Sequence, residues 1–458
     1  MKTASVIVIL FIFALLGHGQ GEVNEPIATG VASIDITPNE PIRLSGYQVR
    51  REPAGETDGK LWAKALAIGG DGEKPAVLIT ADLIGVPRWL TDAVAERLGL
   101  DRAQLAVCAT HTHSGPFVKG TLPHIFGEPI PAEHQAAIDR YAAQLEERLV
   151  EVARQALADR KPARLSWNQG EAGFAQNRRL RYLRGRLGPD VEPPAPVDHD
   201  LPALFVRDAE GTLAAVLLNY ACHCTTMNGG GYNRFHGDWA GVAARLIQER
   251  HPGATAMVAI GCGADQNPEP RGSVELAERH GREIADEIDR LLGESATPIH
   301  DIPACRYGYA ELPFAKLPTE ADLRERARSK TERIRYYAKI LLDRKARGID
   351  PPESLEYPVQ TWAFGNDLAM VFLPGEVVVD YSLRLKREWD GQRLWVNAYS
   401  NDAPCYIASA RVIAEGGYEV DTSMDSYDKP TRLDPAAEER IVEKLRELIP
   451  DEFEAPAN

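Results

Sequence analysis

An alternation of short apolar runs with amphipathic helical stretches is the feature that most constrains the fold of this chain. Each apolar run is rich in β-branched residues, which favour strands, and is followed by a loop and then by apolar residues at helical spacing. The four pairs comprise residues 75–85 with 90–99, 105–116 with 136–157, 215–227 with 239–253, and 255–268 with 273–293. This order predicts an α/β fold with a central mixed or parallel sheet flanked by helices.

The composition argues against some classes of partner. The chain has 458 residues, 44% of them hydrophobic, and its 67 acidic and 52 basic residues give a formal net charge of -15. The hydrophobic content is enough for one large core or two ordinary ones. Because nucleic acids and anionic membrane surfaces favour basic patches, this charge points to a small-molecule or lipid substrate and away from nucleic acid.

The N-terminus has the parts of a secretory signal peptide. Lys2 precedes an apolar run at residues 4–16, and Gly17 and Gly19 form a small-x-small pair near a plausible cleavage point. The run is shorter than the roughly 20 residues that a membrane-spanning helix needs, and no later segment comes close to that length. We expect a signal peptide at residues 1–21, a secreted or periplasmic protein, and no transmembrane segment in the mature chain. An uncleaved anchor is the alternative.

Six cysteines in an exported protein raise the question of disulfides. Cys222 and Cys224 are one residue apart, too close for an easy bridge, and Cys108, Cys262 and Cys405 lie in or beside apolar runs. Buried free thiols are therefore the favoured interpretation. A zinc site made of Cys222, Cys224 and Cys262 lacks any CxxC spacing and is disfavoured.

A highly charged segment interrupts the alternation at about residues 317–348. Apolar residues recur there at roughly helical spacing, which predicts a long, solvent-facing helix that packs one face against the body. A lid over a substrate cleft is the alternative role. A last α/β piece follows, and Asp434 with Pro435 predicts the start of a terminal helix. Without a linker rich in Pro, Gly or Ser, residues 22–458 are predicted to form a single domain with this charged helical insertion.

Polar residues cluster where the predicted strands end. Asp82, His111 with His113, His223 and Asp265 each follow an apolar run, and in open α/β sheets functional groups gather at the carboxyl ends of strands. In an extended chain residues two apart point the same way, so His111 and His113 can face one cavity. Histidines beside carboxylates make a site of the kind that zinc takes in hydrolases. The sequence therefore predicts a metal site at the strand ends.

Several of these residues also have structural interpretations. A pair of histidines one residue apart is more often surface polarity or a hydrogen-bonded structural feature. Glu376, after Phe-Leu-Pro-Gly, fits an ordinary helix start, where a carboxylate is favourable. Asp238 fits the cap of a helix that begins at Trp239. For Glu376 and Asp238 considered alone, these structural interpretations are the favoured ones.

Five motifs together resemble one family, in its order and spacing. They are THTHSGP (residues 110–116), NYACHCTTM (219–227), GDWAG (237–241), FLPGE (372–376) and NAYSNDAPCYIASARVIAEGGYE (397–419). The chain is similar over residues 28–427 to the N-terminal catalytic domain of neutral/alkaline, non-lysosomal ceramidases. This resemblance implies a zinc-dependent amidohydrolase, cleaving an amide bond of the N-acylsphingosine type.

The resemblance also implies roles for individual residues. One Zn²⁺ ion is expected on two histidines, a glutamate and a tyrosine, which match His111, His223, Glu376 and Tyr406. Three further residues are expected to be catalytic: His113 to handle protons or the oxyanion, Arg178 to bind a substrate oxygen, and Asp265 in a supporting place. Zinc so held would activate a water for attack on the carbonyl.

Two departures from the family bear on the substrate. The family follows this domain with a C-terminal β-sandwich, for which the chain leaves no room, and Asn267 stands where a serine is expected. An apolar insertion for an acyl chain is not evident either. Two alternatives therefore stay open: a zinc hydrolase of a soluble N-acyl amide or ester, and a non-catalytic exported metal-binding protein.

Overall fold

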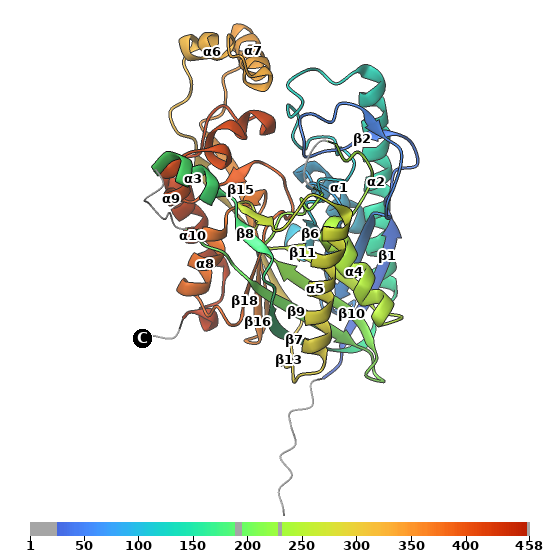
Figure 1. Ribbon diagram of the computed structural model, residues 1–458. Helices are drawn as coiled ribbons and strands as arrows, with labels where there is room; N and C mark the ends of the chain where they lie inside the picture. Colours follow the sequence, from blue (N-terminus) through green and yellow to red (C-terminus); the bar gives the residue numbers. More distant parts are fainter. Residues whose placement is uncertain (1–24, 188–194, 228–230, 456–458) are drawn as a thin grey trace, which may run out of the picture.

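The computed structural model describes residues 25–187, 195–227 and 231–455 (Figure 1). The signal peptide that we predict at residues 1–21 lies outside this part of the chain. Among the helices that are described, none is both long and apolar enough to cross a membrane. The first strand, β1 (Ile27–Asp35), begins close to the start of the described residues.

One large mixed sheet forms the centre of the fold. Its strands follow the order β11-β10-β9-β7-β1-β4-β5-β6, with the short β13 paired to β7. The neighbours β5 and β6 are parallel, as are β10 and β11, and the other neighbours are antiparallel. The remaining bounds are β4 (Trp62–Ile68), β5 (Ala76–Ala81), β6 (Leu105–Ala109), β7 (Lys161–Glu171), β9 (Asp200–Arg207), β10 (Leu213–Tyr220), β11 (Thr255–Ile260) and β13 (Thr297–Ile299). The prediction of a central mixed sheet flanked by helices is confirmed.

The four helices predicted from the apolar spacing are present and pack on this sheet (Figure 1). They are α1 (Arg88–Leu98), α2 (Ala132–Ala158), α4 (Asp238–Arg250) and α5 (Val274–Leu292). In α5, Ile284, Ile288 and Leu291 recur at intervals of three or four residues and are all buried. Such a stripe is what holds a surface helix to a core. The stripe of α2 packs on β1 and β4, whereas α5 packs on α4 and β7.

A second sheet packs against the other face of the first. It has the order β14-β15-β16-β18, from β14 (Pro303–Pro313), β15 (Ser354–Phe364), β16 (Leu368–Phe372) and β18 (Leu394–Asn397). Along β16, Met370 and Phe372 join Leu66 and Leu78 of the large sheet in one core cluster. Val371, between them, belongs to the cluster that also contains residues of α8 (Val379–Glu388) and α10 (Ala436–Leu448). Because side chains alternate along a strand, one strand serves both cores.

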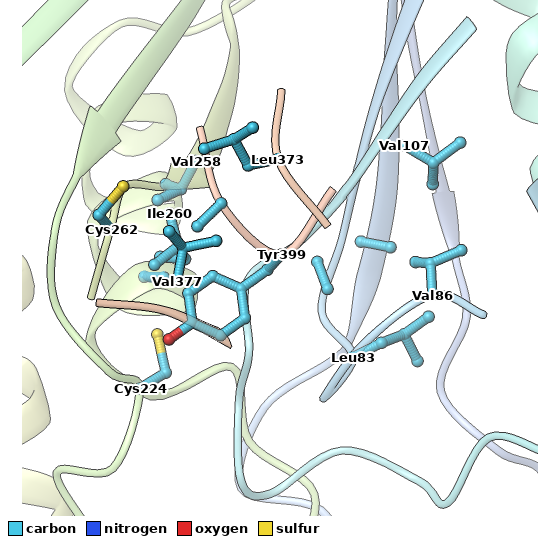
Figure 2. Close-up of a cluster of buried hydrophobic side chains, with 14 of the residues drawn as sticks. Leu83, Val86, Val107, Cys224, Val258, Ile260, Cys262, Leu373, Val377 and Tyr399 are labelled. Carbon is cyan, nitrogen blue, oxygen red and sulfur yellow. The ribbon is translucent and has the colours of Figure 1, made fainter. Parts of the chain in front are cut away.

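Residues 398–401, which follow β18, join the two ends of the large sheet. The amide of Ala398 donates to Ile260 at the end of β11 (2.9 Å), and the amide of Ala109 at the end of β6 donates to Tyr399 (3.0 Å). Figure 2 shows Tyr399 in the hydrophobic cluster that also contains Val107 of β6 and Ile260 of β11. The ends of β6 and β11 are therefore held close together.

The remaining elements are short. They are β2 (Ile42–Arg43), β3 (Pro53–Ala54), η1 (Arg102–Gln104), β8 (Ala175–Asn177), α3 (Arg179–Leu187), β12 (Gln266–Pro268), β17 (Glu376–Val377), β19 (Tyr406–Ile407), α9 (Ala410–Glu415), η2 (Tyr418–Thr422), η3 (Met424–Tyr427) and η4 (Asp451–Phe453). The terminal helix α10 begins directly after Asp434 and Pro435, as predicted.

The charged insertion forms two helices instead of the single long helix that its spacing predicts. These are α6 (Glu320–Arg326) and α7 (Glu332–Ala346), drawn at the top of Figure 1. The break lies at Ser329, whose hydroxyl accepts the amide of Thr331 (3.2 Å) and so competes with the helical hydrogen bonds. Helix α7 is bound to the body by Arg344, which pairs with Asp428 (2.7 Å).

All six cysteines are free thiols, and all but Cys305 are buried. Burial raises the pKa of Cys108 to about 12 and that of Cys222 well above its ordinary value. Thiols that stay protonated are poor nucleophiles and poor metal ligands. The interpretation of the cysteines as packing residues is confirmed for the five buried thiols.

Two glycines, one in α4 and one in α5, give a test of how these two helices pack against each other. A Cβ at Gly281 of α5 would lie 2.5 Å from the side chain of Val242 and 2.8 Å from the amide of Ala243. Gly281→Ala should therefore lower the free energy of unfolding by about 1–3 kcal/mol through overpacking. Gly241 of α4 meets nothing within 4 Å, so Gly241→Ala should raise it by about 0.5–1 kcal/mol. Urea unfolding measures both, and equal effects of the two substitutions would contradict this account.

Candidate metal centre

Three histidines from two strand ends meet in one place. His111 and His113 follow β6, His223 follows β10, and one ring nitrogen from each lies within 4.8 Å of the other two. The loops are joined because Thr112 and Cys224 form a parallel bridge, and the amide of His113 donates to the carbonyl of Cys224 (3.2 Å). This confirms that His111 and His113 face the same space.

The backbone brings the two histidines together in a different way from the extended geometry that the sequence suggests. The strand β6 ends at Ala109, and His111 has a φ of +56°, in the left-handed region that non-glycine residues rarely adopt. Conformations of this kind persist where the surroundings fix them, and they are common at functional sites.

Backbone carbonyls orient two of the imidazoles. Nδ1 of His111 bonds the carbonyl of Ile84 and Nδ1 of His223 bonds the carbonyl of Gly263, each at 2.6 Å. Because a carbonyl only accepts, Nδ1 is the donor in both rings and Nε2 keeps its lone pair. A ring nitrogen fixed in this way is the usual arrangement behind a metal-binding histidine.

Glu376 places a buried carboxylate oxygen beside these lone pairs. Its Oε2 lies 3.4 Å from Nε2 of His111 and 3.1 Å from Nε2 of His223, and no group of the described residues donates a hydrogen bond to it. Burial alone would raise the pKa of Glu376, but the two facing imidazoles hold it well below its usual range. Acceptor atoms that converge on one point need a cation or a proton between them, so this donor set fits a metal ion.

Tyr406 lies on the strand next to Glu376, and Arg178 links its hydroxyl to the histidines. The short strands β17 and β19 pair in parallel with Glu376 opposite Tyr406. The hydroxyl of Tyr406 accepts a hydrogen bond from Arg178 (3.0 Å), and burial raises its pKa well above the ordinary value although Arg178 opposes this. Another guanidinium nitrogen of Arg178, NH1, lies 3.4 Å from Nε2 of His223.

His113 lies at the edge of the cluster. Its Nε2 is 3.2 Å from Nε2 of His111, and the ring of Tyr47 packs against it with centroids 4.9 Å apart. Burial lowers the pKa of His113 well below its ordinary value, and burial lowers the pKa of His223 to about 4. Both rings are thus neutral at physiological pH, as proton transfer and metal binding require.

Three other acidic residues at the strand ends, Asp82, Asp238 and Asp265, have side-chain partners other than the three histidines. Asp82 accepts the amide of Trp62 (2.9 Å), and Asp238 accepts the amide of Thr226 (2.8 Å) next to the start of α4. Asp265 accepts the amide of Val379 (2.9 Å) and the side-chain amide of Asn177 (3.0 Å). The carboxylate of Asp265 therefore bonds no histidine, although its carbonyl accepts the amide of Arg178 (2.8 Å). Asp265 fixes the backbone that carries Arg178.

Sequence reasoning missed several residues at this site. Tyr427 donates its hydroxyl to Oε1 of Glu376, and the ring of Tyr399 packs on His111 with centroids 4.3 Å apart. Arg50 donates to the carbonyl of His113. None of these residues has a spacing that marks it, and a motif match to the region around Tyr399 was the only available signal.

The space beside the cluster is small. A cavity of about 10 Å³ is bounded by residues that include His111, Glu376, Tyr399 and Tyr427. This is about the smallest volume that can hold a single water. A larger cavity of about 340 Å³, bounded by Lys64, Asp82 and other residues, is not lined by the three clustered histidines.

A model of the protein family described as neutral/alkaline non-lysosomal ceramidase, N-terminal, matches residues 28–263. This range is slightly more than half of the 458 residues and includes His111, His113, Arg178 and His223. No curated protein matches the chain by sequence.

Two solved structures share the fold. The crystal structure of neutral ceramidase from Pseudomonas aeruginosa matches with a TM-score of 0.69 at 19% identity, covering 95% of this chain and 77% of that one. A ceramidase complexed with C2 matches with a TM-score of 0.68 at 18% identity over the same shares of the two chains. At these identities the likeness is one of fold.

The hydrogen bond from Tyr427 to Glu376 gives a test of the metal centre. Tyr427→Phe removes the donor that holds Oε1 and should raise the metal dissociation constant about tenfold, since partners of metal ligands contribute 10–100-fold to affinity. Competition with a chromophoric chelator measures this constant. Tyr141→Phe is the matched control, because Tyr141 is also buried and donates to the carbonyl of Ile36 (2.9 Å) far from the site. An unchanged constant in Tyr427→Phe would contradict the role of Tyr427.

Proposed function

Since the chain belongs to the neutral/alkaline non-lysosomal ceramidase family, we propose that it is a zinc-dependent amidohydrolase of the N-acylsphingosine type. Family membership supports a ceramidase-like hydrolase. The observation that carries the metal part is the buried Oε2 of Glu376, which faces the Nε2 atoms of His111 and His223 at 3.4 and 3.1 Å. We also propose export through the N-terminal signal peptide, which the sequence alone supports.

In this proposal His111, His223, Glu376 and Tyr406 hold one zinc ion. Two imidazole nitrogens, a carboxylate and a phenol oxygen are donors that zinc accepts in catalytic sites. Zinc bound there would polarise the substrate carbonyl and lower the pKa of a bound water toward about 7.

His113 is the proposed proton carrier. It is neutral and lies next to the ligand His111, so it can accept a proton from the attacking water. The same ring can then donate that proton to the leaving amine. Tyr47 packs on the ring and Arg50 holds the carbonyl of His113, so the imidazole has a fixed place.

Arg178 is the proposed substrate-binding cation. Its Nε and NH2 groups donate to Glu419 and Tyr406, whereas NH1 faces the histidine cluster. A guanidinium is charged at every physiological pH, so it can bind a substrate oxygen whatever the state of the neighbouring histidines.

A soluble N-acyl amide is the second candidate substrate. One cavity beside His111 and Glu376 measures about 10 Å³, whereas pockets for drug-sized ligands measure roughly 300–1,000 Å³. A ceramide acyl chain would need a larger opening next to the site, and a short soluble substrate would need less. A soluble N-acyl amide is therefore the second candidate substrate, after the lipid.

Paired histidine substitutions test the metal assignment. His223→Ala should remove both zinc and hydrolysis, because it deletes a ligand. His113→Ala should keep stoichiometric zinc and lose about 10²–10⁴-fold in kcat, because it deletes only the proton carrier. Metal analysis of the purified variants alongside their kinetics separates the two. Loss of zinc from His113→Ala, or full activity of His223→Ala, would show that the ligand set is a different one.

Direct assay tests the substrate. We expect the purified protein to hydrolyse a labelled short-chain ceramide, to lose this activity with a chelator, and to regain it with added zinc. Turnover of soluble N-acyl compounds alone would favour the second candidate. Zinc binding without turnover of either substrate class would indicate a non-catalytic metal-binding protein.

A further inference from the structure

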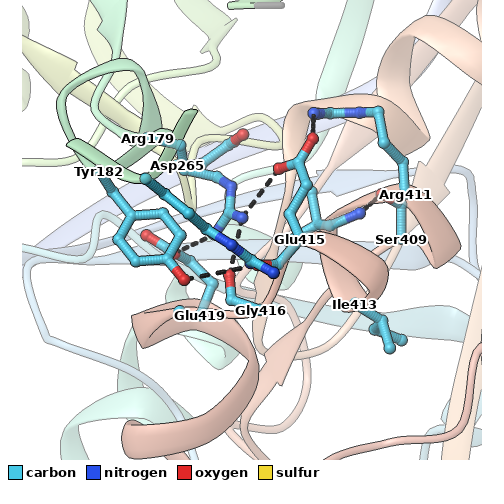
Figure 3. Close-up of polar contacts among 12 residues, drawn as sticks. Arg179, Tyr182, Asp265, Ser409, Arg411, Ile413, Glu415, Gly416 and Glu419 are labelled. Carbon is cyan, nitrogen blue, oxygen red and sulfur yellow. Dashed lines mark hydrogen bonds and ion pairs between the residues drawn. The ribbon is translucent and has the colours of Figure 1, made fainter. Parts of the chain in front are cut away.

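Two consecutive arginines at the site share one carboxylate. Nε of Arg178 donates to Oε1 of Glu419 (2.9 Å), and NH1 of Arg179 donates to Oε2 of the same residue (2.5 Å). Glu419 is 5% exposed, and Figure 3 shows it next to Arg179 in a group of polar contacts. Both oxygens of this buried carboxylate are therefore used on neighbouring guanidinium groups.

The contacts of Arg178 fix two of its guanidinium nitrogens and leave the third, NH1, facing the histidines. Glu419 takes Nε and the Tyr406 hydroxyl takes NH2 (3.0 Å), while NH1 lies 3.4 Å from Nε2 of His223. Because the guanidinium is planar, two fixed nitrogens determine the direction of the third. NH1 must then point at the histidine cluster.

A second carboxylate binds Arg179 but does not touch Arg178. Glu415 accepts from NH2 of Arg179 (2.9 Å) and from NH1 of Arg411 (2.6 Å). Arg411 in turn pairs with Asp380 (2.7 Å). The network thus contains three carboxylates, of Glu419, Glu415 and Asp380, and among them only Glu419 contacts Arg178 in the described part of the chain.

The backbone before Glu419 places it in this position. Gly416 and Gly417 have φ values of +73° and +108°, which residues with a Cβ rarely adopt. The turn η2 that follows presents Tyr418 and Glu419 together. The ring of Tyr418 lies 5.6 Å from the guanidinium carbon of Arg178, so the same turn also confines the arginine from the side.

We propose that Glu419 is the positioning residue of Arg178, holding its guanidinium so that NH1 faces the substrate oxygen beside His223. This inference rests on the proposed function, in which Arg178 binds substrate. Glu419 touches neither the histidines nor Glu376 by any contact in the described part of the chain. Its effect on the reaction therefore passes through Arg178, and small misplacements of a binding group can cost about 10²-fold in rate.

The test compares Glu419→Gln with Glu415→Gln. Each substitution removes one negative charge from the same network, and only the first weakens the contact to Arg178. Glu419→Gln should lower kcat/KM about 10–100-fold at unchanged zinc content, and Glu415→Gln should lower it less than threefold. Equal effects of the two variants, or loss of zinc from Glu419→Gln, would overturn the proposal.

Chemical rescue is a second measurement of the positioning role. A purely structural role of Glu419 would not change its result. Added guanidinium should restore part of the activity lost in Arg178→Ala, since Glu419 can hold the free ion in the vacant place. The same addition should restore nothing in Arg178→Ala combined with Glu419→Gln. Equal rescue in both would contradict the positioning role, and Glu419→Asp gives a second variant that keeps the charge if Glu419→Gln does not fold.

Crystal structures of the two glutamine variants separate a failure of this inference from a failure of the proposed function. Arg178 should leave Tyr406 in Glu419→Gln and stay on it in Glu415→Gln, whatever the substrate is. If the wild-type protein hydrolyses no amide but the arginine moves as stated, the proposed function fails and the positioning role stands. An arginine that stays in place in both variants overturns the positioning role alone.

Discussion

The structure depends on one buried carboxylate oxygen that faces two imidazole lone pairs. No group of the described residues donates a hydrogen bond to Oε2 of Glu376, and this carboxylate and the imidazoles of His111 and His223 are almost fully buried. A buried anion without a partner costs several kcal/mol, so the fold holds these atoms together at an energetic cost that a bound cation would offset. The two imidazoles bond the backbone carbonyls of Ile84 and Gly263. This makes the arrangement rigid, because a backbone carbonyl cannot change its protonation or its rotamer.

The topology explains how histidines from distant strands of the sheet can meet. The strands β6 and β10 are far apart in the strand order, yet the bridge between Thr112 and Cys224 joins the loops that follow them. Residues 398–401 hold the ends of β6 and β11 together by backbone hydrogen bonds. The segment that does this lies between the two short strands that supply Glu376 and Tyr406. The segment that joins the two ends of the sheet therefore also positions the two strands that carry these proposed ligands.

The sequence predicted the large sheet and its helices because both follow from local periodicity. It predicted that His111 and His113 face one space, although the reason it gave, an extended chain, differs from the left-handed φ found at His111. Glu376 and Tyr406 came only from the family resemblance, since β17 and β19 have two residues each and are too short to show a pattern. The partners of the imidazoles could not be predicted, because a backbone carbonyl has no side chain to mark it. Asp265, placed at the site from sequence, instead fixes the backbone of Arg178.

Electrostatics gives a reason for the charged network behind Arg178. A guanidinium 3.4 Å from a ring nitrogen of His223 would oppose a divalent cation bound at that nitrogen, because like charges repel strongly where water is excluded. Glu419 compensates this charge at 2.9 Å, and the network continues through Arg179 and Glu415 to Arg411 and Asp380, so three cations meet three anions. Arg178 can then present a hydrogen-bond donor to the site without adding net charge to it. The same compensation explains why two adjacent arginines are tolerated in a buried place, since neither is left without a carboxylate.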